Sequence, residues 1–217
     1  MENTPGKKQA VDKKPWDMRL AKLLTNVISP PLVSVVGLFT LTATINEKLV
    51  WNWTIFFVLV VVISPTLYTV WLYKTGRVTE IFLPVRENRI RVIYSMIFFN
   101  AIGLISMLIL KAPFVLTAFA FVGILQSTII LIITMYWKIS AHTTGIAGLA
   151  VFLTGIFGWS GAPALIMIPL VSWARVRLDS HSFWQVLGGV ILGTVFIGTA
   201  TFLLYTYCGG FGLTCKS

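Results

Sequence analysis

The chain has 217 residues, of which 57% are hydrophobic and only 11% are charged. This is too apolar for a soluble domain, so the composition excludes most soluble enzymes and binding modules. A net charge of +10 can indicate nucleic-acid binding, but it also arises when Lys and Arg collect in the cytoplasmic loops of a membrane protein. We favour the second explanation and expect no nucleic-acid partner.

Several runs of about 20 apolar residues predict an all-α polytopic membrane protein, a bundle of about six to seven transmembrane helices. Backbone groups in lipid must be hydrogen-bonded within the chain, and these runs lack the alternation of barrel strands, so helices are expected. We divide the chain into a basic cytoplasmic tail, residues 1–19, and a transmembrane helical domain, residues 20–217. The first apolar run lacks a small-residue cleavage site, so we interpret it as a retained span.

The first three polar breaks separate four predicted spans. The first span covers about 23–45, and Pro30-Pro31 near its start should kink or delay the helix. The second covers about 53–73, with Trp and Tyr residues at both ends as expected at a membrane interface. After the longest polar loop, residues 92–137 form two spans joined by a tight turn at Lys111-Ala-Pro113.

The last third of the chain is less regular. The apolar runs 143–157 and 162–174 are short for a membrane core, so they either extend into their flanks or form a shallow hairpin packed on small residues. The final span covers about 186–207, and its glycines should allow close helix contact. Cys208 and Cys215 follow; they either pair in an oxidising compartment or remain two separate thiols.

With seven crossings, almost all Lys and Arg residues fall on one side of the membrane. The exceptions are Lys48, Lys111 and Lys216. Because cations mark cytoplasmic loops, we expect the N-terminus and the polar loops on the cytoplasmic side and the C-terminus on the opposite side. The expected location is an inner cell membrane, with all the polar loops of interest on one face.

The only two histidines, His142 and His181, each lie in a polar loop at the end of an apolar segment. Phosphate chemistry at a membrane surface would use such a pair, one imidazole to attack and one to move a proton. The hairpin between them returns the chain to the same face, which could bring them together. The alternative interpretation is that both are ordinary interfacial residues.

Polar neighbours could complete such a site. If the final helix begins near Ser180 or Ser182, Gln185 shares a face with His181, and its carbonyl could accept from Nδ1–H and leave Nε2 free. The longest loop contributes guanidinium groups whose forks match phosphate oxygens, or which serve only as topology signals. These are Arg86, Arg89 and Arg91.

Together these residues resemble the type-2 phosphatidate phosphatase superfamily, which includes lipid phosphate phosphatases, acid phosphatases and vanadium haloperoxidases. Its motifs read KxxxxxxRP, PSGH and SRxxxxxHxxxD. The segment Ile139–His142 is similar to the second motif, Arg175 and His181 have the spacing of the third, and the segment Arg86–Arg91 is similar to a divergent first motif. The chain departs from the pattern in the first motif's lysine and proline, and Gln185 stands where the family has aspartate.

The resemblance implies a lipid phosphatase that acts on a phosphatidate-like or isoprenoid phosphate. Arg175, Ser140 and the arginines of the first motif would hold the phosphoryl oxygens. His181 would attack phosphorus to form a phosphohistidine, and His142 would protonate the departing lipid alkoxide. No metal or cofactor is expected, because arginines would stabilise the charge.

Substitutions in these motifs keep a second function open. The alternative is a catalytically weak or inactive relative that serves as a membrane scaffold or as a subunit of a larger complex. The expected partners are the lipid phosphate substrate and membrane lipids, and either a homo-oligomer or a membrane complex is compatible with the sequence. A transporter or channel is disfavoured, because the predicted spans contain no ionisable residue between their loops.

Overall fold

The computed structural model describes residues 15–45, 47–78 and 86–208, and all regular secondary structure within these ranges is helical. The elements follow one another along the chain as α1 (Trp16–Val27), α2 (Pro30–Ile45), α3 (Lys48–Phe57), η1 (Val58–Ile63), α4 (Ser64–Lys74), α5 (Arg86–Ile109), α6 (Phe114–Tyr136), α7 (Ala141–Phe157), η2 (Gly158–Ser160), η3 (Ala162–Ile166), α8 (Met167–Arg177) and α9 (Phe183–Cys208).

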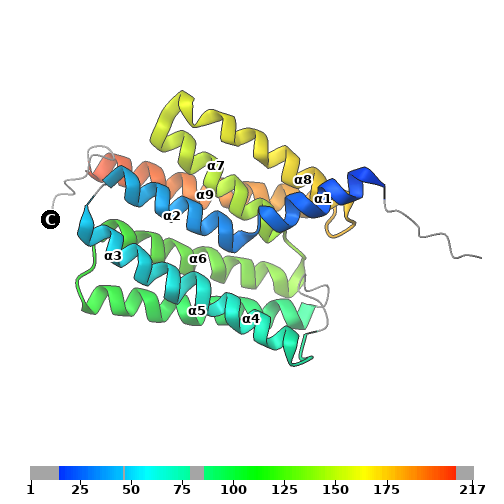
Figure 1. The fold of residues 1–217 in the computed structure, drawn as a ribbon, viewed down its shortest axis with the longest axis horizontal. Coiled ribbons are helices and arrows are strands. Elements are labelled where there is room, and N and C mark those ends of the chain that lie inside the picture. Colours follow the sequence, from blue (N-terminus) through cyan, green and yellow to red (C-terminus); the bar gives the residue numbers. More distant parts are fainter. Residues whose placement is uncertain (1–14, 46, 79–85, 209–217) are drawn as a thin grey trace, which may run out of the picture.

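The long helices lie side by side, so the loops collect at the two ends of the bundle (Figure 1). Helix α7 packs on α9 and α2, α5 packs on α6, and α1 packs on α8. Helix α1, the first turn of α5 and the segments that precede α7 and α9 lie at one end, which we call the basic end. The carboxyl end of α9 lies at the other. This arrangement brings the polar loops 137–140 and 178–182 together although they are far apart in the sequence.

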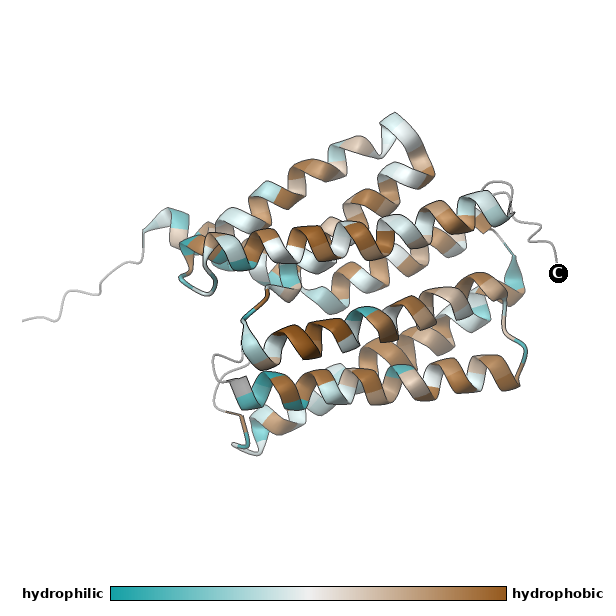
Figure 2. Ribbon diagram, turned by 180° about the vertical axis from the view of Figure 1, so that it is seen from behind, coloured by the Kyte–Doolittle hydropathy of each residue, from teal (hydrophilic) through white to brown (hydrophobic). Residues whose placement is uncertain are grey.

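Five helical segments are long and apolar enough to cross a membrane, and a sixth results if the bent pair α1–α2 counts as one span. The all-α prediction is therefore confirmed for the described residues, with five or six long apolar helices. Large apolar side chains face outward, for example Phe98 and Phe202, whose exposed fractions are 61% and 66%. Figure 2 shows hydrophilic residues gathered mainly near the ends of the helices, as expected for a lipid-facing surface.

The break predicted near Pro30-Pro31 separates two helices. Helix α1 ends at Val27, α2 begins at Pro30, and their axes differ by 50°. A proline has no N–H and is tolerated in the first turn of a helix, where that group would have no intrahelical partner. Because α1 begins at Trp16, residues 16–19, which the sequence assigned to the tail, belong to this helix. Residues 1–14 of that tail lie outside the described residues.

The second span is longer than predicted, because α3, η1 and α4 form one segment from Lys48 to Lys74. Its middle, Val58–Ile63, is π-helical and leads directly to Pro65. Proline cannot donate to a preceding carbonyl and its ring crowds the turn before it, so a wider helix accommodates it. The Ser64 hydroxyl donates to the Leu59 carbonyl at 2.9 Å, which helps to satisfy the widened turn.

Two structures were expected for this region, spans that extend into their flanks or a shallow hairpin. The observed hairpin of α7, η2, η3 and α8 has features of both. Helix α7 and its extension to Ser160 are long enough to count as a span, whereas the return arm from Ala162 to Arg177 does not count as one. The tip of the hairpin stops short of the end at which α2 and α9 meet the far loops (Figure 1). The seven crossings assumed for the topology therefore include one short arm.

Small residues allow α7 and α9 to pack closely, as predicted. A Cβ at Gly193 would overlap the Thr144 carbonyl, and one at Gly148 would lie 2.8 Å from Ile197 Cγ1. At the far end of α9, Cys208 is the last helical residue and Cys215 lies outside the described residues, so their pairing stays an open prediction. The close approach fixes the start of α7, and therefore His142, against the start of α9.

Candidate functional site

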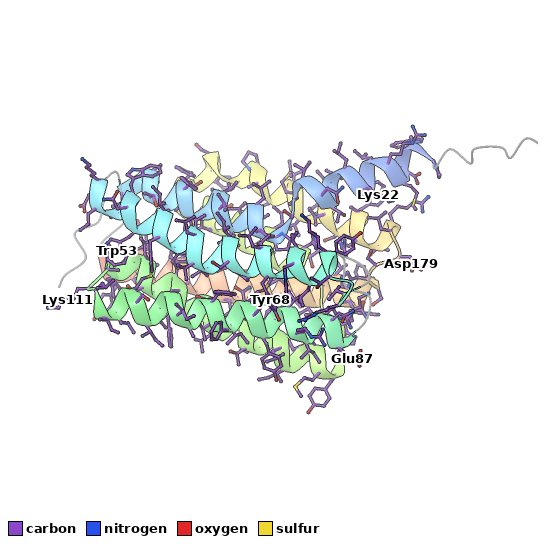
Figure 3. The ribbon with its side chains drawn as sticks, turned by 60° about the horizontal axis from the view of Figure 1, so that its bottom comes forward. Lys22, Trp53, Tyr68, Glu87, Lys111 and Asp179 are labelled. Carbon is purple, nitrogen blue, oxygen red and sulfur yellow. The ribbon has the colours of Figure 1, made fainter. Side chains whose placement is uncertain are left out.

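The predicted site residues cluster at the basic end of the bundle. Figure 3 labels Lys22, Glu87 and Asp179 at this end, whereas Lys111 and Trp53 lie at the opposite end. The first turn of α5, the loop before α7, the last turn of α8 and the loop before α9 all meet here. The structure thus gathers at one end the loops that the sequence placed on one face.

Ser140 caps the amino end of α7. Its Oγ accepts a hydrogen bond from the Thr143 N–H at 3.5 Å, and its carbonyl accepts from the Thr144 hydroxyl at 2.9 Å. Its side chain is fully buried. Serine favours this position because its oxygen satisfies an N–H that has no intrahelical partner. The structure shows Ser140 as the cap of α7. That its hydroxyl binds phosphate stays a prediction.

Two hydrogen bonds tie the loop before α7 to the start of α9. The Ser140 N–H donates to the Gln185 carbonyl at 3.3 Å, and the Thr143 hydroxyl donates to the Val186 carbonyl at 3.2 Å. Gly189 leaves room for this contact, because a Cβ there would overlap Thr143 Oγ1. The segments that resemble the second and third family motifs therefore form one packed unit.

Arg175 lies near both histidines. It is in the last turn of α8 and is only 3% exposed. Its positive charge acts on the imidazoles of both His142 and His181, and His142 in turn acts on His181. Residues 39 positions apart in the sequence are thus brought into one cluster, as the hairpin between them led us to expect.

The environment of His181 favours the neutral imidazole. Burial, reinforced by the charges of Arg175 and Lys138, lowers its pKa to about 3, although Gln185 acts in the opposite direction. Its Nδ1 is buried and has no hydrogen-bond partner among the described residues. A neutral imidazole retains the lone pair that a nucleophile or a general base needs.

Gln185 has a partner that the sequence did not suggest, in addition to its effect on His181. Its Oε1 accepts from the Ser182 N–H at 3.1 Å, and the Ser182 Oγ accepts from the Gln185 N–H at 3.4 Å. This reciprocal pair is a capping box, a serine followed three residues later by glutamine at a helix start. Because an amide oxygen has two lone pairs, this cap leaves Oε1 able to accept from His181 as well, and Gln185 acts on the imidazole by raising its pKa. That Gln185 orients His181 through Nδ1 stays a prediction.

The structure separates two of the arginines of the first motif, Arg89 and Arg91. Arg89 lies near Lys138, whose pKa it helps to lower, whereas Arg91 lines a surface groove with Tyr68 and Tyr94. Two positions along an α-helix point roughly 200° apart, so they face opposite sides of α5. Arg86 begins α5, but its side chain lies outside the described residues. Of the two arginines whose side chains are described, Arg89 is therefore the one near Lys138.

Lys138 is a cation of the cluster that the sequence interpretation counted only as a topology signal. Burial lowers its pKa, the charges of Arg89 and Arg175 lower it further, and Asp179 opposes them. Only its position directly before the segment Ile139–His142 hinted at this role. Lys138 and Arg175 thus place two positive charges beside His181, and Arg89 lies near Lys138.

Helix α1 also contributes to the site. The Thr25 backbone carbonyl accepts a hydrogen bond from His142, and Asp17 forms an ion pair with Arg177 at 2.6 Å. The sequence interpretation missed this helix because it began the first span after the tail. The recurrence of apolar residues at Leu20, Leu23, Leu24 and Val27 is the signal that could have found it.

The cluster offers a neutral imidazole, a second imidazole and three nearby cations, a combination suited to a phosphoryl group or another compact anion. No protein-family model, no curated protein and no solved structure matches this chain. Function must therefore be argued from the motif resemblance and from this geometry.

Proposed function

We propose that the protein is an integral membrane lipid phosphatase of the type-2 phosphatidate phosphatase kind. The observation that carries this proposal is the convergence of His142, His181 and Arg175 at one end of an apolar helical bundle. A site at the end of such a bundle meets lipid headgroups while the lipid chains stay in the membrane. The substrate class is a phosphatidate-like or isoprenoid phosphate ester.

In the proposed reaction, His181 attacks phosphorus as the bond to the lipid oxygen breaks. Because Nδ1 is buried, Nε2 is the nitrogen that we assign to the attack. His142 gives a proton to the departing lipid alkoxide, and then takes a proton from the water that breaks the phosphorus–nitrogen bond. Arg175, Arg89 and Lys138 balance the charge of the phosphoryl oxygens throughout.

The first test is phosphate release by the purified protein from phosphatidate, phosphatidylglycerol phosphate and a prenyl diphosphate, with and without vanadate. Vanadate-sensitive release, abolished in His181→Ala with the fold retained, is the expected result. Retained turnover in that variant would remove His181 as the nucleophile.

The arginines provide a matched comparison within one helix. Arg89→Gln should lower turnover more than Arg91→Gln does, because only Arg89 lies beside Lys138. Equal losses, or a larger loss at Arg91, would contradict the assignment of Arg89 to the phosphate site. Folding of each variant is checked by its thermal unfolding temperature.

A second function is favoured by one observation. Gln185 stands where the resembled family has aspartate, and its Oε1 also accepts from the Ser182 N–H, so it brings no negative charge to stabilise a protonated His181. The chain would then be a scaffold or a subunit of a membrane complex. Absence of turnover on all three lipids, in protein shown to be folded, supports this alternative and directs the search to a partner.

We further propose that the basic end faces the cytoplasm, because it carries most of the Lys and Arg residues of the described part of the chain. Single cysteines at Asp179 and at Lys111, in a chain with Cys208 and Cys215 replaced by serine, test this orientation. An impermeant thiol reagent applied from outside the cell should label position 111 and spare position 179. Labelling in the reverse pattern would overturn the orientation.

A further inference from the structure

A groove of about 640 Å³ on the surface of the bundle is bordered by α4 and α5. Tyr68 of α4 lines it, and its other lining residues belong to α5. Figure 3 labels Tyr68 and Glu87, one from each of these helices. The groove is separate from the histidine cluster, because its Arg91 and the Arg89 near Lys138 face opposite sides of α5.

Four side chains of α5 follow one another along this groove. Their positions differ by four, three and four residues, so they form a single stripe on one face of the helix. From the basic end inward they are Glu87, Arg91, Tyr94 and Phe98. All four are exposed, so a ligand in the groove can reach them. The order along the stripe is therefore an anion, a cation, a phenol and a hydrocarbon ring.

The two charges of the groove have no partner within the described part of the chain. The structure gives neither Glu87 nor Arg91 a hydrogen bond or an ion pair there. If the two side chains turned toward each other, an exposed pair four residues apart would contribute only about 0.2–0.5 kcal/mol. A ligand that offers each group its own counter-ion could displace such a pair. The groove is therefore suited to a zwitterion.

Aromatic stacking holds the wall of the groove on the α4 side. Tyr68 stacks on Trp71 with ring centroids 5.8 Å apart, and the Arg77 guanidinium lies 4.6 Å from the centroid of the Trp71 ring. Tyr68 also packs against the buried Leu72 and Val92. Because Trp and Tyr side chains favour the headgroup level of a membrane, this wall indicates that the charged part of the groove lies at that depth.

We infer that the groove binds a zwitterionic phospholipid, whose headgroup carries an ammonium group beyond its phosphate. The ammonium group pairs with Glu87, the phosphate pairs with Arg91, and an acyl chain lies on Phe98. Glu87 and Arg91 are about 6 Å apart along the helix, which suits the short link between the ammonium group and the phosphate. Phe98 lies about 10 Å further toward the middle of the bundle, where the acyl chains of a membrane begin.

A lipid that carries only a negative charge fits the groove less well. Its phosphate could also pair with Arg91, but the Glu87 carboxylate one turn away would repel it. The inference goes beyond the proposed phosphatase, because this lipid is bound without being cleaved and its binding does not require His181.

The test compares dioleoyl phosphatidylethanolamine with dioleoyl phosphatidylglycerol, which keeps the chains and the phosphate but has no ammonium group. Each lipid is titrated against the purified, delipidated protein in a non-ionic detergent, and binding is measured from the rise in unfolding temperature. We expect the wild-type protein to bind phosphatidylethanolamine roughly two- to fivefold more tightly. Equal binding, or tighter binding of phosphatidylglycerol, would overturn the inference.

Variants of the two charged residues separate their roles. Glu87→Gln should abolish the preference for phosphatidylethanolamine, Glu87→Lys should reverse it, and Arg91→Gln should weaken the binding of both lipids. Glu47→Gln, at an exposed position at the other end of the bundle, should keep the preference. An unchanged preference in the two Glu87 variants would overturn the inference. The unfolding temperature of each lipid-free variant checks its fold.

The His181→Ala variant distinguishes this groove from the histidine cluster. It should keep the preference for phosphatidylethanolamine, whether or not the wild-type protein releases phosphate from any lipid. Loss of the preference in His181→Ala would place the bound lipid at the histidine cluster and would overturn the inference.

Discussion

Arg177 Nε and Asp17 Oδ2 lie 2.6 Å apart and join residues separated by 160 positions. Arg177 ends α8 and Asp17 lies in the first turn of α1, so this ion pair connects the first helix to the return arm of the hairpin. Both side chains remain partly exposed, and an exposed pair of this kind contributes modestly to stability. Its main effect is to position α1, which also carries the Thr25 carbonyl that contacts His142.

Replacement of Asp17 by Asn should loosen α1 without unfolding the bundle, because it removes the charge that holds Arg177. Hydrogen exchange within residues 16–27 should become faster, and exchange in α5 and α6 should stay unchanged. Glu47→Gln, at an exposed position at the other end of the bundle, is the matched control. Global loss of protection in Asp17→Asn would mean that α1 is part of the cooperative core.

Gly193→Ala should destabilise the protein more than Gly198→Ala. A Cβ at position 193 would overlap the backbone carbonyl of Thr144, which cannot move without shifting α7. At position 198 the nearest atom is a side-chain methyl, Val151 Cγ1 at 3.2 Å, which can yield. We expect a loss of about 1–3 kcal/mol for the first and less for the second, measured by thermal unfolding. Similar losses at both sites would contradict the close packing of α7 on α9.

Gln185→Ala should weaken the start of α9 by about 0.5–2 kcal/mol, because it removes one half of the capping box. Gln185→Glu should keep the cap, since a carboxylate oxygen can still accept from the Ser182 N–H. It should also raise the pKa of His181, because a negative charge beside the imidazole favours its protonated form. Nuclear magnetic resonance titration of His181 measures this shift, and an unchanged pKa would show that position 185 does not act on the imidazole.

Acidification should destabilise the protein through His181. Its pKa is lowered from 6.5 to about 3 in the folded protein, so between these values the unfolded chain binds a proton that the folded chain does not. The free energy of unfolding should therefore fall as the pH falls through this window, by an amount on the order of a few kcal/mol. His181→Asn should show a flatter dependence, measured by denaturant unfolding at several pH values. Ser180→Ala, which changes no titratable group, should keep the slope of the parent.

The helical bundle and its breaks could be predicted because they depend on local properties of the sequence. Long apolar runs require helices in lipid, and Pro30 and the turn at Lys111-Ala-Pro113 interrupt them where a helix cannot continue. The approach of His142 to His181 was also accessible, because a hairpin between them must return the chain to the same end. Glycines in α9 indicated the close packing that fixes this approach.

The partner of each polar atom could not be predicted in the same way. Gln185 is compatible with both an imidazole and the Ser182 N–H. Whether it caps α9 depends on where α9 begins, and sequence places that boundary only within a few residues. Arg89 and Arg91 look equivalent until the start and rotation of α5 are known. Asn100 is an ordinary amide in the sequence, and only the packing around it reveals a buried oxygen that has no hydrogen-bond partner among the described residues.

The hydrogen bonds from Ser140 to Gln185 and from Thr143 to Val186 have a thermodynamic consequence. They join the bases of α7 and α9, so His142 and His181 are attached to a common, preassembled support. An arriving anion would therefore not have to bring two mobile segments together, and little conformational entropy would be lost when it binds. Folding has already fixed the two segments relative to each other, because it packs the glycines of α9 against α7.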